Sequence, residues 1–278
     1  MKIGIIGAGK VGTAIGHALQ KKGFEVVAVS DVAGEKAFQA ARPYLGGDPL
    51  YTSDNGLVAT AADIIAITTQ DGVIGNVAQT LSQGTERLDG KLIFHTSGAH
   101  PSSVLKPLDE RGAILGSLHP LQTFPDVESA IRVLPGTYIF IEGDAAALPL
   151  LERLGREIGI ATVPIEGKDK IYYHLSAVFV CNLLCALLYA SGGVMDKAGI
   201  TLKPFFPIIH ATLKNIETKG PLLSLTGPVI RGDVGTVKDH IRAMDNMKLP
   251  RRIYKALSRA AQQMVAERQA LNRQTCAA

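Results

Sequence analysis

A glycine-rich turn near the start of the chain constrains the fold more than any other feature. Residues 2–6 form a short apolar run, which is typical of a buried parallel strand. The run leads directly into a turn with the pattern G-x-G-x-x-G over residues 7–12. Apolar residues at helical spacing follow over 11–22, and a Val-rich run over 25–29 predicts a second strand. The segment therefore predicts one right-handed βαβ unit with parallel strands.

The three glycines of this turn have different expected roles. Gly7 permits a tight turn, Gly9 leaves room for a diphosphate beside the backbone, and Gly12 lets the helix approach the strand. The free amides at the start of the helix would face phosphate oxygens. We therefore predict a dinucleotide site made by Gly7, Ala8, Gly9, Lys10, Val11 and Gly12. A glycine turn without a ligand is the alternative.

Ser30 and Asp31 end the second predicted strand and are expected to lie near the adenosine ribose. Asp31 follows Gly12 at close to the expected interval of about 20 residues. Its carboxylate would accept hydrogen bonds from the ribose and repel a 2′-phosphate. Ser30 could instead donate to a 2′-phosphate, and Lys36 is nearby in the sequence, so both NAD and NADP remain open as the cofactor. Asp31 could also simply cap the next helix.

Strands and helices alternate as far as about residue 165. Further strands are predicted over 61–68, 91–95, 113–117, 137–142 and 160–163, with helices over 34–41, 73–81, 102–110 and 145–158. This order predicts an α/β fold with a doubly wound Rossmann domain over residues 1–165. Residues 166–278 contain no convincing strand and predict an all-helical domain that binds substrate and forms a dimer. Its helices are expected over 168–192, 203–217, 226–245 and 251–272.

Composition and charge narrow the possible classes of protein. The net charge of +4 is mild, and the basic residues near the end do not alternate with aromatic ones, so we expect no nucleic-acid partner. The 3 cysteines form no C-x-x-C pair and indicate free thiols in a reducing cytoplasm. The apolar stretch 175–194 resembles a membrane span, but it contains Asn182, Ser191 and two glycines. We predict a buried central helix there, and no membrane association.

The fourth predicted strand of the sheet ends in a polar segment. Ligands of open α/β sheets bind at the carboxyl ends of the strands. Thr68, Thr69 and Gln70 are therefore predicted to line the nicotinamide side of the cofactor. Asp71, which follows them, could cap the next helix.

Three further segments carry a family resemblance that covers essentially the whole chain. They are His95-Thr96-Ser97-Gly98, Gly116-Ser117-Leu118-His119-Pro120-Leu121-Gln122-Thr123-Phe124 and Thr226-Gly227-Pro228-Val229-Ile230-Arg231-Gly232-Asp233. With the glycine turn, they resemble a bacterial branch of Rossmann-like, NADP- or deazaflavin-dependent oxidoreductase-like proteins with an uncharacterised C-terminal domain. The branch is similar to 6-phosphogluconate dehydrogenase, 3-hydroxyacid dehydrogenases, ketopantoate reductase and pyrroline-5-carboxylate reductase. The resemblance implies that substrate binds between a Rossmann domain and a helical domain.

The resemblance also implies a set of substrate and catalytic residues. The dehydrogenases of this superfamily have a Ser-rich substrate loop after the fifth strand, which corresponds here to the segment with Ser97 and Gly98. They use a Lys, and often an Asn, on the first long helix of the second domain. That helix offers Lys170, His174 and Asn182 here. Val178 departs from the pattern, because such enzymes have a polar residue there.

The chemistry of these side chains fits a hydride-transfer site. Reduction of C=O or C=N leaves charge on the heteroatom, and an imidazole such as His174 can supply the required proton. Asn182 can both donate to and accept from the same substrate group. Alternatively, His174 and Asn182 could fix helix packing. Lys170 could extend from the helix start to solvent, and Ser97 could cap the next helix.

Three more residues are predicted to contact substrate. His119 precedes a proline, so we expect it in a rigid loop at the sheet edge, directed to the cleft together with Gln122. Arg231 lies in a loop expected to enter a helix at Pro228 and could bind a carboxylate, although an interface role is equally open. A structural role for His119 is also open. The histidines and acidic residues show no metal-ligand spacing, so we predict no metal.

These observations predict a cytoplasmic NAD(P)-dependent oxidoreductase. It would act on a small, anionic C=O or C=N substrate and form a homodimer through its helical domain. One alternative is a dinucleotide-binding sensor without catalysis, which Val178 favours. The other is an enzyme that exchanges hydride between a deazaflavin and NADP.

Overall fold

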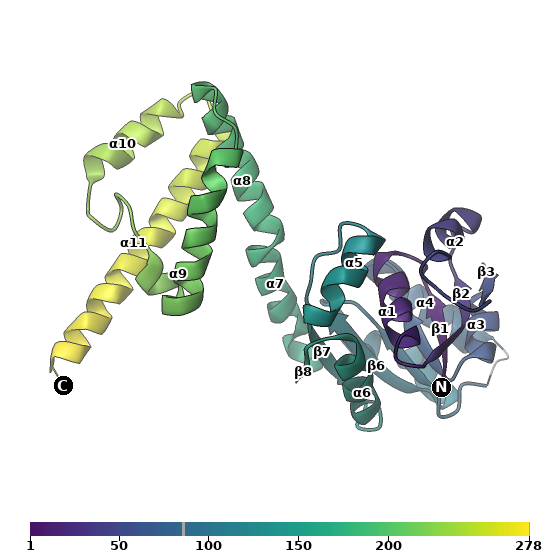
Figure 1. Ribbon diagram of the computed structural model, residues 1–278. Coiled ribbons are helices and arrows are strands. Elements are labelled where there is room, and N and C mark those ends of the chain that lie inside the picture. Colours follow the sequence, from purple (N-terminus) through teal and green to yellow (C-terminus); the bar gives the residue numbers. More distant parts are fainter. Residues whose placement is uncertain (85–86, 278) are drawn as a thin grey trace. The chain divides into compact units, whose positions relative to one another are not determined.

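The chain forms two compact units. The computed structural model describes residues 1–84 and 87–277, with side chains in the last helix described as far as residue 274 (Figure 1). The units are Met1–Phe179 and Val180–Ala278. The first unit extends beyond the predicted boundary at 165 because the helix after that point, α7 (Lys170–Val180), buries Lys170 in it.

The first unit is built on one sheet of eight strands in the order β3-β2-β1-β4-β5-β6-β7-β8. All neighbouring strands are parallel except β6 and β7, which are antiparallel. The strands are β1 (Lys2–Ile6), β2 (Glu25–Ser30), β3 (Leu50–Thr52), β4 (Ile64–Ile67), β5 (Leu92–His95), β6 (Ile114–Pro120), β7 (Tyr138–Gly143) and β8 (Ala161–Pro164). The prediction of a doubly wound α/β fold is confirmed.

Helices cover both faces of this sheet (Figure 1). One face carries α1 (Lys10–Gln20), α5 (Val127–Val133) and α6 (Leu148–Ile158), and the other carries α3 (Asn55–Ala61), α4 (Asp71–Gln83) and the 3-10 segment η1 (Ser102–Arg111). The short helix α2 (Glu35–Ala41) follows β2. Alternate strand residues separate into two apolar clusters, with Ile64 in one and Ile65 in the other. This period of two places a core on each side of the sheet.

The structure differs from the sequence prediction mainly in short elements and in β6. The predictions missed β3, α3 and α5, which have only three to seven residues each. His119 lies inside β6 rather than in a loop, because β6 continues beyond Ser117 to pair with β7. His119 pairs there with Phe140. Pro120 is tolerated because it is the last residue of the strand.

The second unit consists of helices. They are α8 (Asn182–Met195), α9 (Phe206–Ser224), α10 (Val234–Ala243) and α11 (Lys248–Ala277). The helix predicted over 168–192 is divided at Cys181, where no proline or glycine signals a break. The helix predicted from residue 226 begins only at Val234, because two glycines of the preceding loop, Gly227 and Gly232, have positive φ.

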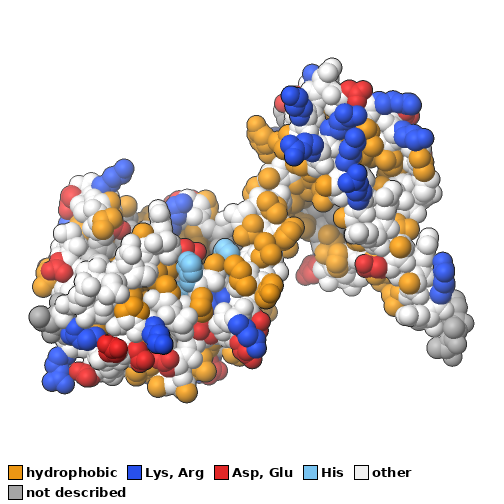
Figure 2. Space-filling view, turned by 180° about the vertical axis from the view of Figure 1, so that it is seen from behind, with side chains coloured by type: hydrophobic (Ala, Val, Ile, Leu, Met, Phe, Trp, Pro, Cys, Tyr) orange, Lys and Arg blue, Asp and Glu red, His pale blue; other side chains and the backbone are white. Residues whose placement is uncertain are grey.

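This helical unit buries few of its apolar side chains. Among its described residues, only Ala190, Met195 and Met244 belong to the buried apolar set. Large apolar side chains remain exposed along the helices, as Figure 2 shows; they include Leu183, Tyr189, Phe206, Ile208 and Leu213. Cys181 and Cys185 are free thiols, whereas the side chain of Cys276 lies outside the described residues.

The prediction of a buried central helix over 175–194 is wrong. The helical stretch Gly167–Ala198 has a mean hydropathy of 1.9 in its most apolar window, and only 11% of that window is buried. By length and composition alone this stretch could cross a membrane. The apolar pattern is present, but most of this window is exposed in the part of the chain that the structure describes.

Candidate active site at the carboxyl edge of the sheet

The glycine turn joins β1 to α1 with the geometry that the sequence predicts. Gly7 has a φ of 108°, and a Cβ there would lie 2.9 Å from the backbone of Thr68. A Cβ on Gly12 would collide with the Gly7 carbonyl oxygen, so α1 can approach β1 this closely only because Gly12 has no side chain. No atom lies within 4 Å of the Cβ position of Gly9. The turn is thus tight at two glycines and open at the third.

The start of α1 is suited to an anion. Gly9 is its N-cap and makes no side-chain cap, and the first turn contains no acidic residue. Lys10 is exposed, and Val11 is partly exposed. Amides of such a first turn point along the helix axis and favour negative charge. The open space at Gly9 lies directly at these amides, so a diphosphate can reach them without displacing a side chain.

Asp31 and Ser30 have partners within the protein. Asp31 Oδ2 accepts a hydrogen bond from the Ala8 amide at 2.9 Å, and its Oδ1 accepts from the Ala33 amide at 2.8 Å. Asp31 therefore ties the glycine turn to the end of β2. The Ser30 hydroxyl is fully buried and donates to Asn55 at 2.7 Å, so it faces the protein interior rather than a ligand.

The polar segment after β4 also supports the glycine turn. The Thr68 hydroxyl donates a hydrogen bond to the Gly7 carbonyl oxygen at 2.6 Å and so stabilises the conformation of the turn. Thr69 has a buried hydroxyl oxygen without a hydrogen-bond partner. Gln70 is exposed and is the N-cap of α4. Of these three predicted residues, Thr69 has a hydroxyl without a partner, and this hydroxyl can still form a hydrogen bond with a ligand.

The loop after β5 is held by His95 and Ser97. Ser97 is buried, and its Oγ accepts from the amides of Ala99 and His100 at 3.1 and 3.0 Å. His95 Nδ1 accepts from the Ser97 amide at 3.1 Å, and burial lowers the pKa of His95 to about 3. His95 is therefore a neutral internal support. Ser97 shapes the loop, in line with the capping alternative, and leaves Gly98 at its tip.

Gly98, His119 and His174 meet at one point, although they come from three distant parts of the sequence. A Cβ on Gly98 would lie 2.6 Å from His174 Nδ1 and 2.9 Å from His119 Nε2. The two imidazole rings are 6.2 Å apart and nearly perpendicular, at 78°. His174 Nδ1 is buried and has no hydrogen-bond partner. Two imidazole nitrogens thus converge over a glycine at the carboxyl edge of the sheet.

Lys170 lies in the protein interior, one helical turn before His174 on α7. It is 2% exposed, donates a hydrogen bond to Ser117 Oγ, and lies 3.8 Å from Glu142 Oε1. Glu142 also accepts from the Ser102 amide at 2.6 Å and from its hydroxyl at 2.8 Å. Burial lowers the pKa of Lys170 to about 8, against the opposing effect of Glu142. Lys170 is therefore an internal group that fastens α7 to β6, and the alternative that it extends from the helix start to solvent is wrong.

Sequence reasoning missed Tyr173, which belongs to the same cluster. Its hydroxyl lies 2.7 Å from His119 Nδ1, and its ring stacks on Phe140 with centroids 4.0 Å apart. Tyr173 precedes His174 and sits one turn beyond Lys170, so helical spacing from Lys170 would have included it. The antiparallel pairing of β6 with β7, which the sequence does not reveal, brings its partners together.

The remaining predicted residues lie apart from this cluster or in the other unit. Gln122 is exposed, and its side-chain oxygen accepts from the Thr123 amide at 2.9 Å. Asn182 is exposed at the start of α8, after the break at Cys181. Arg231 is exposed in the loop before α10. Asn182 and Arg231 belong to the helical unit.

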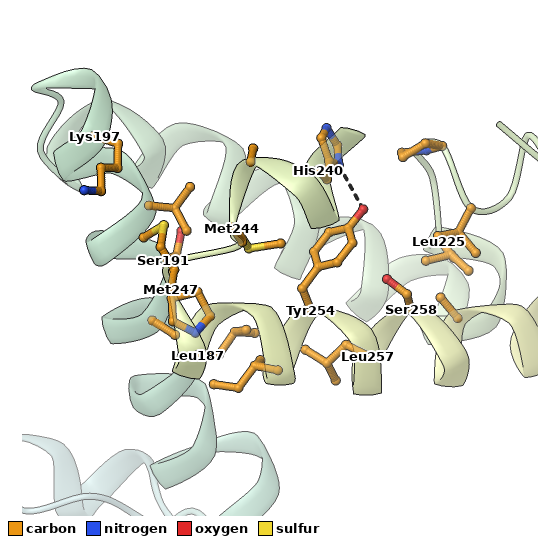
Figure 3. A pocket seen from close by; sticks show the side chains of 18 residues that line it. Leu187, Ser191, Lys197, Leu225, His240, Met244, Met247, Tyr254, Leu257 and Ser258 are labelled. Carbon is orange, nitrogen blue, oxygen red and sulfur yellow. Dashed lines mark hydrogen bonds between the residues drawn. The ribbon is translucent and has the colours of Figure 1, made fainter. Parts of the chain in front are cut away.

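The helical unit has a cavity of its own, of about 700 Å³ (Figure 3). Its lining comes from α8, α10, α11 and the loop before α10 and is mostly apolar, with Leu187, Met244 and Leu257 among the contributors. The polar contacts include the hydrogen bond between His240 Nδ1 and the Tyr254 hydroxyl, at 2.8 Å. Within the described part of the chain, no three His, Cys, Asp or Glu side chains are grouped so that they could hold a metal ion.

Two family models match this chain, each over a little less than half of its length. Residues 1–120 match a Rossmann-like domain, and residues 137–261 match DUF2520, a domain of unknown function. The chain thus carries a Rossmann-like match followed by a DUF2520 match. A comparison with curated protein sequences finds no match.

Solved structures share this fold over almost the whole chain. A candidate NADP oxidoreductase from Bacteroides fragilis is 24% identical, with a TM-score of 0.80 over 94% of this chain and 98% of that one. A protein from Thermotoga maritima is 22% identical, with a TM-score of 0.73 over 96% and 99%. An imine reductase from Myxococcus stipitatus in complex with NADP+ is 16% identical, with a TM-score of 0.68 over 96% and 95%. At these identities the likeness establishes the fold.

Proposed function

We propose that this chain is an NADP-dependent oxidoreductase that transfers hydride between the nicotinamide and the carbon of a small C=O or C=N substrate. One observation carries the proposal. The glycine turn, with its open space at Gly9, and the convergent histidines, His119 and His174, lie along the same carboxyl edge of the sheet. A dinucleotide held at the first feature would direct its nicotinamide along that edge.

The residues of the turn fit a dinucleotide. The first turn of α1 offers amides, a basic Lys10 and no acidic side chain to an anion. Thr69 offers a hydroxyl that still lacks a partner. NADP is the cofactor we propose, because the Myxococcus stipitatus relative was solved with NADP+. The bound cofactor would supply the hydride, and every other part of the chemistry falls to side chains of this protein.

His174 is the residue that we propose as proton donor to the substrate heteroatom. Hydride addition leaves that atom with excess charge, and a proton from an imidazole removes it. His174 Nδ1 has no hydrogen-bond partner within the described part of the protein, so it is the nitrogen left to bond a carbonyl or imine group. His119 is held neutral, because burial lowers its pKa to about 3, so it serves the site as a hydrogen-bonding group and not as a cation.

The substrate that we propose is small and carries an anionic group. Arg231 and Asn182 are exposed in the helical unit, and we propose that they bind anionic and polar groups of a ligand. A guanidinium can hold a carboxylate through two parallel hydrogen bonds, and an amide can both donate and accept. Loss of carboxylate recognition in Arg231→Ala, with NADPH binding retained, is the expected result.

A substrate panel tests the proposed activity. Aldehydes, 2-oxo acids and cyclic imines would be offered with NADPH, and the loss of its absorbance would be followed. We expect turnover of at least one class, strongly reduced in His174→Ala and little changed in the exposed control His210→Ala. NADPH binding without turnover on any member would support a dinucleotide sensor. Turnover only when a deazaflavin is added would support the deazaflavin alternative.

We further propose that the protein is a cytoplasmic homodimer. A unit with so few buried apolar side chains lacks a sufficient core of its own. A second copy would cover the exposed apolar helices, and a closed twofold arrangement is the simplest form. Membrane insertion of the apolar stretch is disfavoured, because Lys170 near its start is buried against Ser117 and Glu142. The two free thiols suit a reducing compartment.

A further inference from the structure

The hydrogen bond between His119 and Tyr173 indicates which nitrogen of His119 carries the proton. The Tyr173 hydroxyl lies 2.7 Å from His119 Nδ1, and the two rings meet edge to face at 5.6 Å. Phe140, the cross-strand neighbour of His119, stacks on Tyr173 with centroids 4.0 Å apart and holds it in place. A phenol O–H is a stronger donor than an imidazole N–H, and an imidazole nitrogen is a stronger acceptor than a phenol oxygen. Tyr173 therefore donates, and Nδ1 accepts.

His119 is neutral in the folded chain, so the state of one nitrogen determines that of the other. Burial is the main reason why the pKa of His119 falls to about 3, and the charges of Lys170 and His174 lower it further. Burial also raises the pKa of Tyr173, which therefore keeps its proton. In a neutral imidazole, the hydrogen bond of one nitrogen sets the protonation of the other. Because Nδ1 accepts from Tyr173, Nε2 carries the proton and is a donor.

The Nε2–H group of His119 has no hydrogen-bond acceptor in the described part of the chain. Nε2 lies 2.9 Å, and His174 Nδ1 lies 2.6 Å, from the position that a Cβ on Gly98 would occupy. Gly98 itself fills that side of the two rings, so a ligand atom has to approach them from another side. His174 Nδ1 is also without a partner. Two neighbouring imidazoles therefore each have a nitrogen that still lacks a hydrogen bond.

The described residues around the two histidines offer no free carboxylate to a cation. Helix α7 contains no acidic residue. Glu142 already accepts from the amide and hydroxyl of Ser102 and lies 3.8 Å from Lys170 Nζ. Asp71 is the other carboxylate whose charge acts on Lys170, and it is exposed to solvent at the start of α4. A positively charged ligand group would therefore meet donors here, and not an acceptor.

We propose that His119 Nε2–H binds the oxygen of a C=O substrate, and that the enzyme reduces carbonyl groups in preference to C=N groups. The inference rests on the proposed function, which places the proton donor at His174. A carbonyl oxygen has two lone pairs, so it can accept a hydrogen bond from His119 while it takes the proton from His174. An imine nitrogen has one lone pair, and an iminium nitrogen has none and is positively charged. Neither nitrogen can use both donors.

Protons and electrons balance in this step. The carbonyl carbon receives the hydride with both of its electrons, and the pair of the broken C=O π bond moves to oxygen. A proton from His174 completes the O–H bond, so the carbonyl is reduced to an alcohol and the cofactor is oxidised. His174 regains a proton from solvent after the alcohol has left. His119 keeps its proton throughout and its tautomer does not change, so Tyr173 is a positioning residue that acts through His119.

A comparison of carbonyl compounds with cyclic imines tests the preference in the full-length protein with NADPH. Aldehydes, 2-oxo acids and cyclic imines are offered, and cyclopentanone and 1-pyrroline serve as a pair of the same ring size. We expect the best carbonyl substrate to have a kcat/KM at least about tenfold above that of any imine. Faster turnover of an imine would overturn the inference and leave the proposed function intact.

Substitution of neighbouring tyrosines tests the role of the hydrogen bond. Tyr173→Phe removes the hydroxyl and keeps the ring on Phe140, whereas Tyr172→Phe is a matched control, because Tyr172 is 70% exposed on the same helix. We expect Tyr173→Phe to lower kcat/KM for the carbonyl substrate about tenfold, with unchanged affinity for NADPH. His119→Gln keeps an N–H donor and should retain more activity than His119→Leu. Equal kinetics in the two tyrosine variants would overturn the inference.

NMR of histidine labelled with nitrogen-15 supplies a readout that does not depend on activity. Between about pH 5 and pH 8, we expect a proton on His119 Nε2 and none on Nδ1. The Nδ1 resonance should shift in Tyr173→Phe and remain in place in Tyr172→Phe. A proton on Nδ1 in the wild-type protein would overturn the inference even in an active enzyme. Absence of NADPH binding would instead count against the proposed function, and the resonances would still decide the tautomer.

Discussion

Lys170 Nζ donates a hydrogen bond to Ser117 Oγ, and this bond fastens the start of α7 to β6. His119 lies two residues after Ser117 on the same strand, and His174 lies one helical turn after Lys170. The internal pair therefore fixes the register in which the two histidines meet over Gly98. A buried lysine that the sequence suggested as a catalytic group is the anchor of the candidate site.

Removal of this anchor should destabilise the first unit. In Lys170→Met, Glu142 keeps its bonds from Ser102 but loses the only cation that the structure shows within 4 Å of it. Breaking a buried pair from one side costs about 3 kcal/mol of unfolding free energy. Denaturant unfolding should show this loss. Lys168→Met is the control, since the exposed pair of Lys168 with Glu166 contributes little; equal stability of the two variants would contradict the anchoring role.

The neutral histidines predict an acid-sensitive fold. The pKa of both His95 and His119 is lowered to about 3 in the folded chain, whereas an unfolded histidine titrates near 6.5. Between these values the unfolded chain binds more protons, so stability falls as the pH falls. Each histidine contributes about 1.4 kcal/mol per pH unit in this window.

Denaturant unfolding between about pH 7 and pH 5 measures this slope. His95→Gln should flatten it, because one of the two buried imidazoles is gone. His210→Gln, which removes an exposed histidine of the helical unit, should leave the slope unchanged. A slope that is the same in all three proteins would show that His95 is already charged, or solvated, in the folded state.

Gly98→Ala should disable the histidine cluster without unfolding the protein. The new Cβ would lie within 3 Å of both imidazoles, so the rings must move apart. We expect loss of turnover by at least about tenfold with little change in NADPH affinity. Gly72→Ala is a suitable comparison, because no atom lies within 4 Å of its Cβ position. Retained turnover in Gly98→Ala would mean that the close approach of the rings is not needed.

Gly9→Ala separates cofactor binding from folding. Nothing lies within 4 Å of the Cβ position of Gly9, so the protein should keep its melting temperature. The added methyl group would occupy the space proposed for the diphosphate, and the Kd for NADPH should rise about tenfold or more. Gly46→Ala, also with an open Cβ position, provides the reference. Unchanged affinity in Gly9→Ala would place the phosphates elsewhere.

The exposed apolar helices predict a dimer in solution. Light scattering with size-exclusion chromatography should give twice the chain mass at micromolar concentration. Ile208→Glu places a charge on α9 at a side chain that is 64% exposed and should shift the mass toward the monomer. Asn215 on the same helix is already polar and exposed, so Asn215→Glu should leave the mass unchanged. A monomeric wild-type protein would contradict the proposed assembly.

The sequence was sufficient for the sheet and the glycine turn because their signals are local. A buried strand before Gly7, helical spacing after it and a second strand specify a βαβ unit within about 30 residues. Short elements such as β3 and α3 have too few residues to show a period. The reversal of β7 is a property of the sheet as a whole, and β6 is longer than predicted because it pairs with this strand.

The candidate site was only partly predictable for a related reason. Residue types indicated His119, His174 and Gly98, but their meeting depends on three separate segments. Ser30 and Ser97 looked available for ligands, yet each forms hydrogen bonds inside the protein. Tyr173 carried no motif at all. Its role follows from its distance to His119, which pairing of β6 with β7 and docking of α7 determine together.

Calorimetric titration of the full-length protein with NADPH measures whether the glycine turn binds a dinucleotide. We expect a binding heat with about one site per chain, weakened by Gly9→Ala and unaffected by Tyr172→Phe. A folded protein that gives no heat with either NADPH or NADH would contradict it.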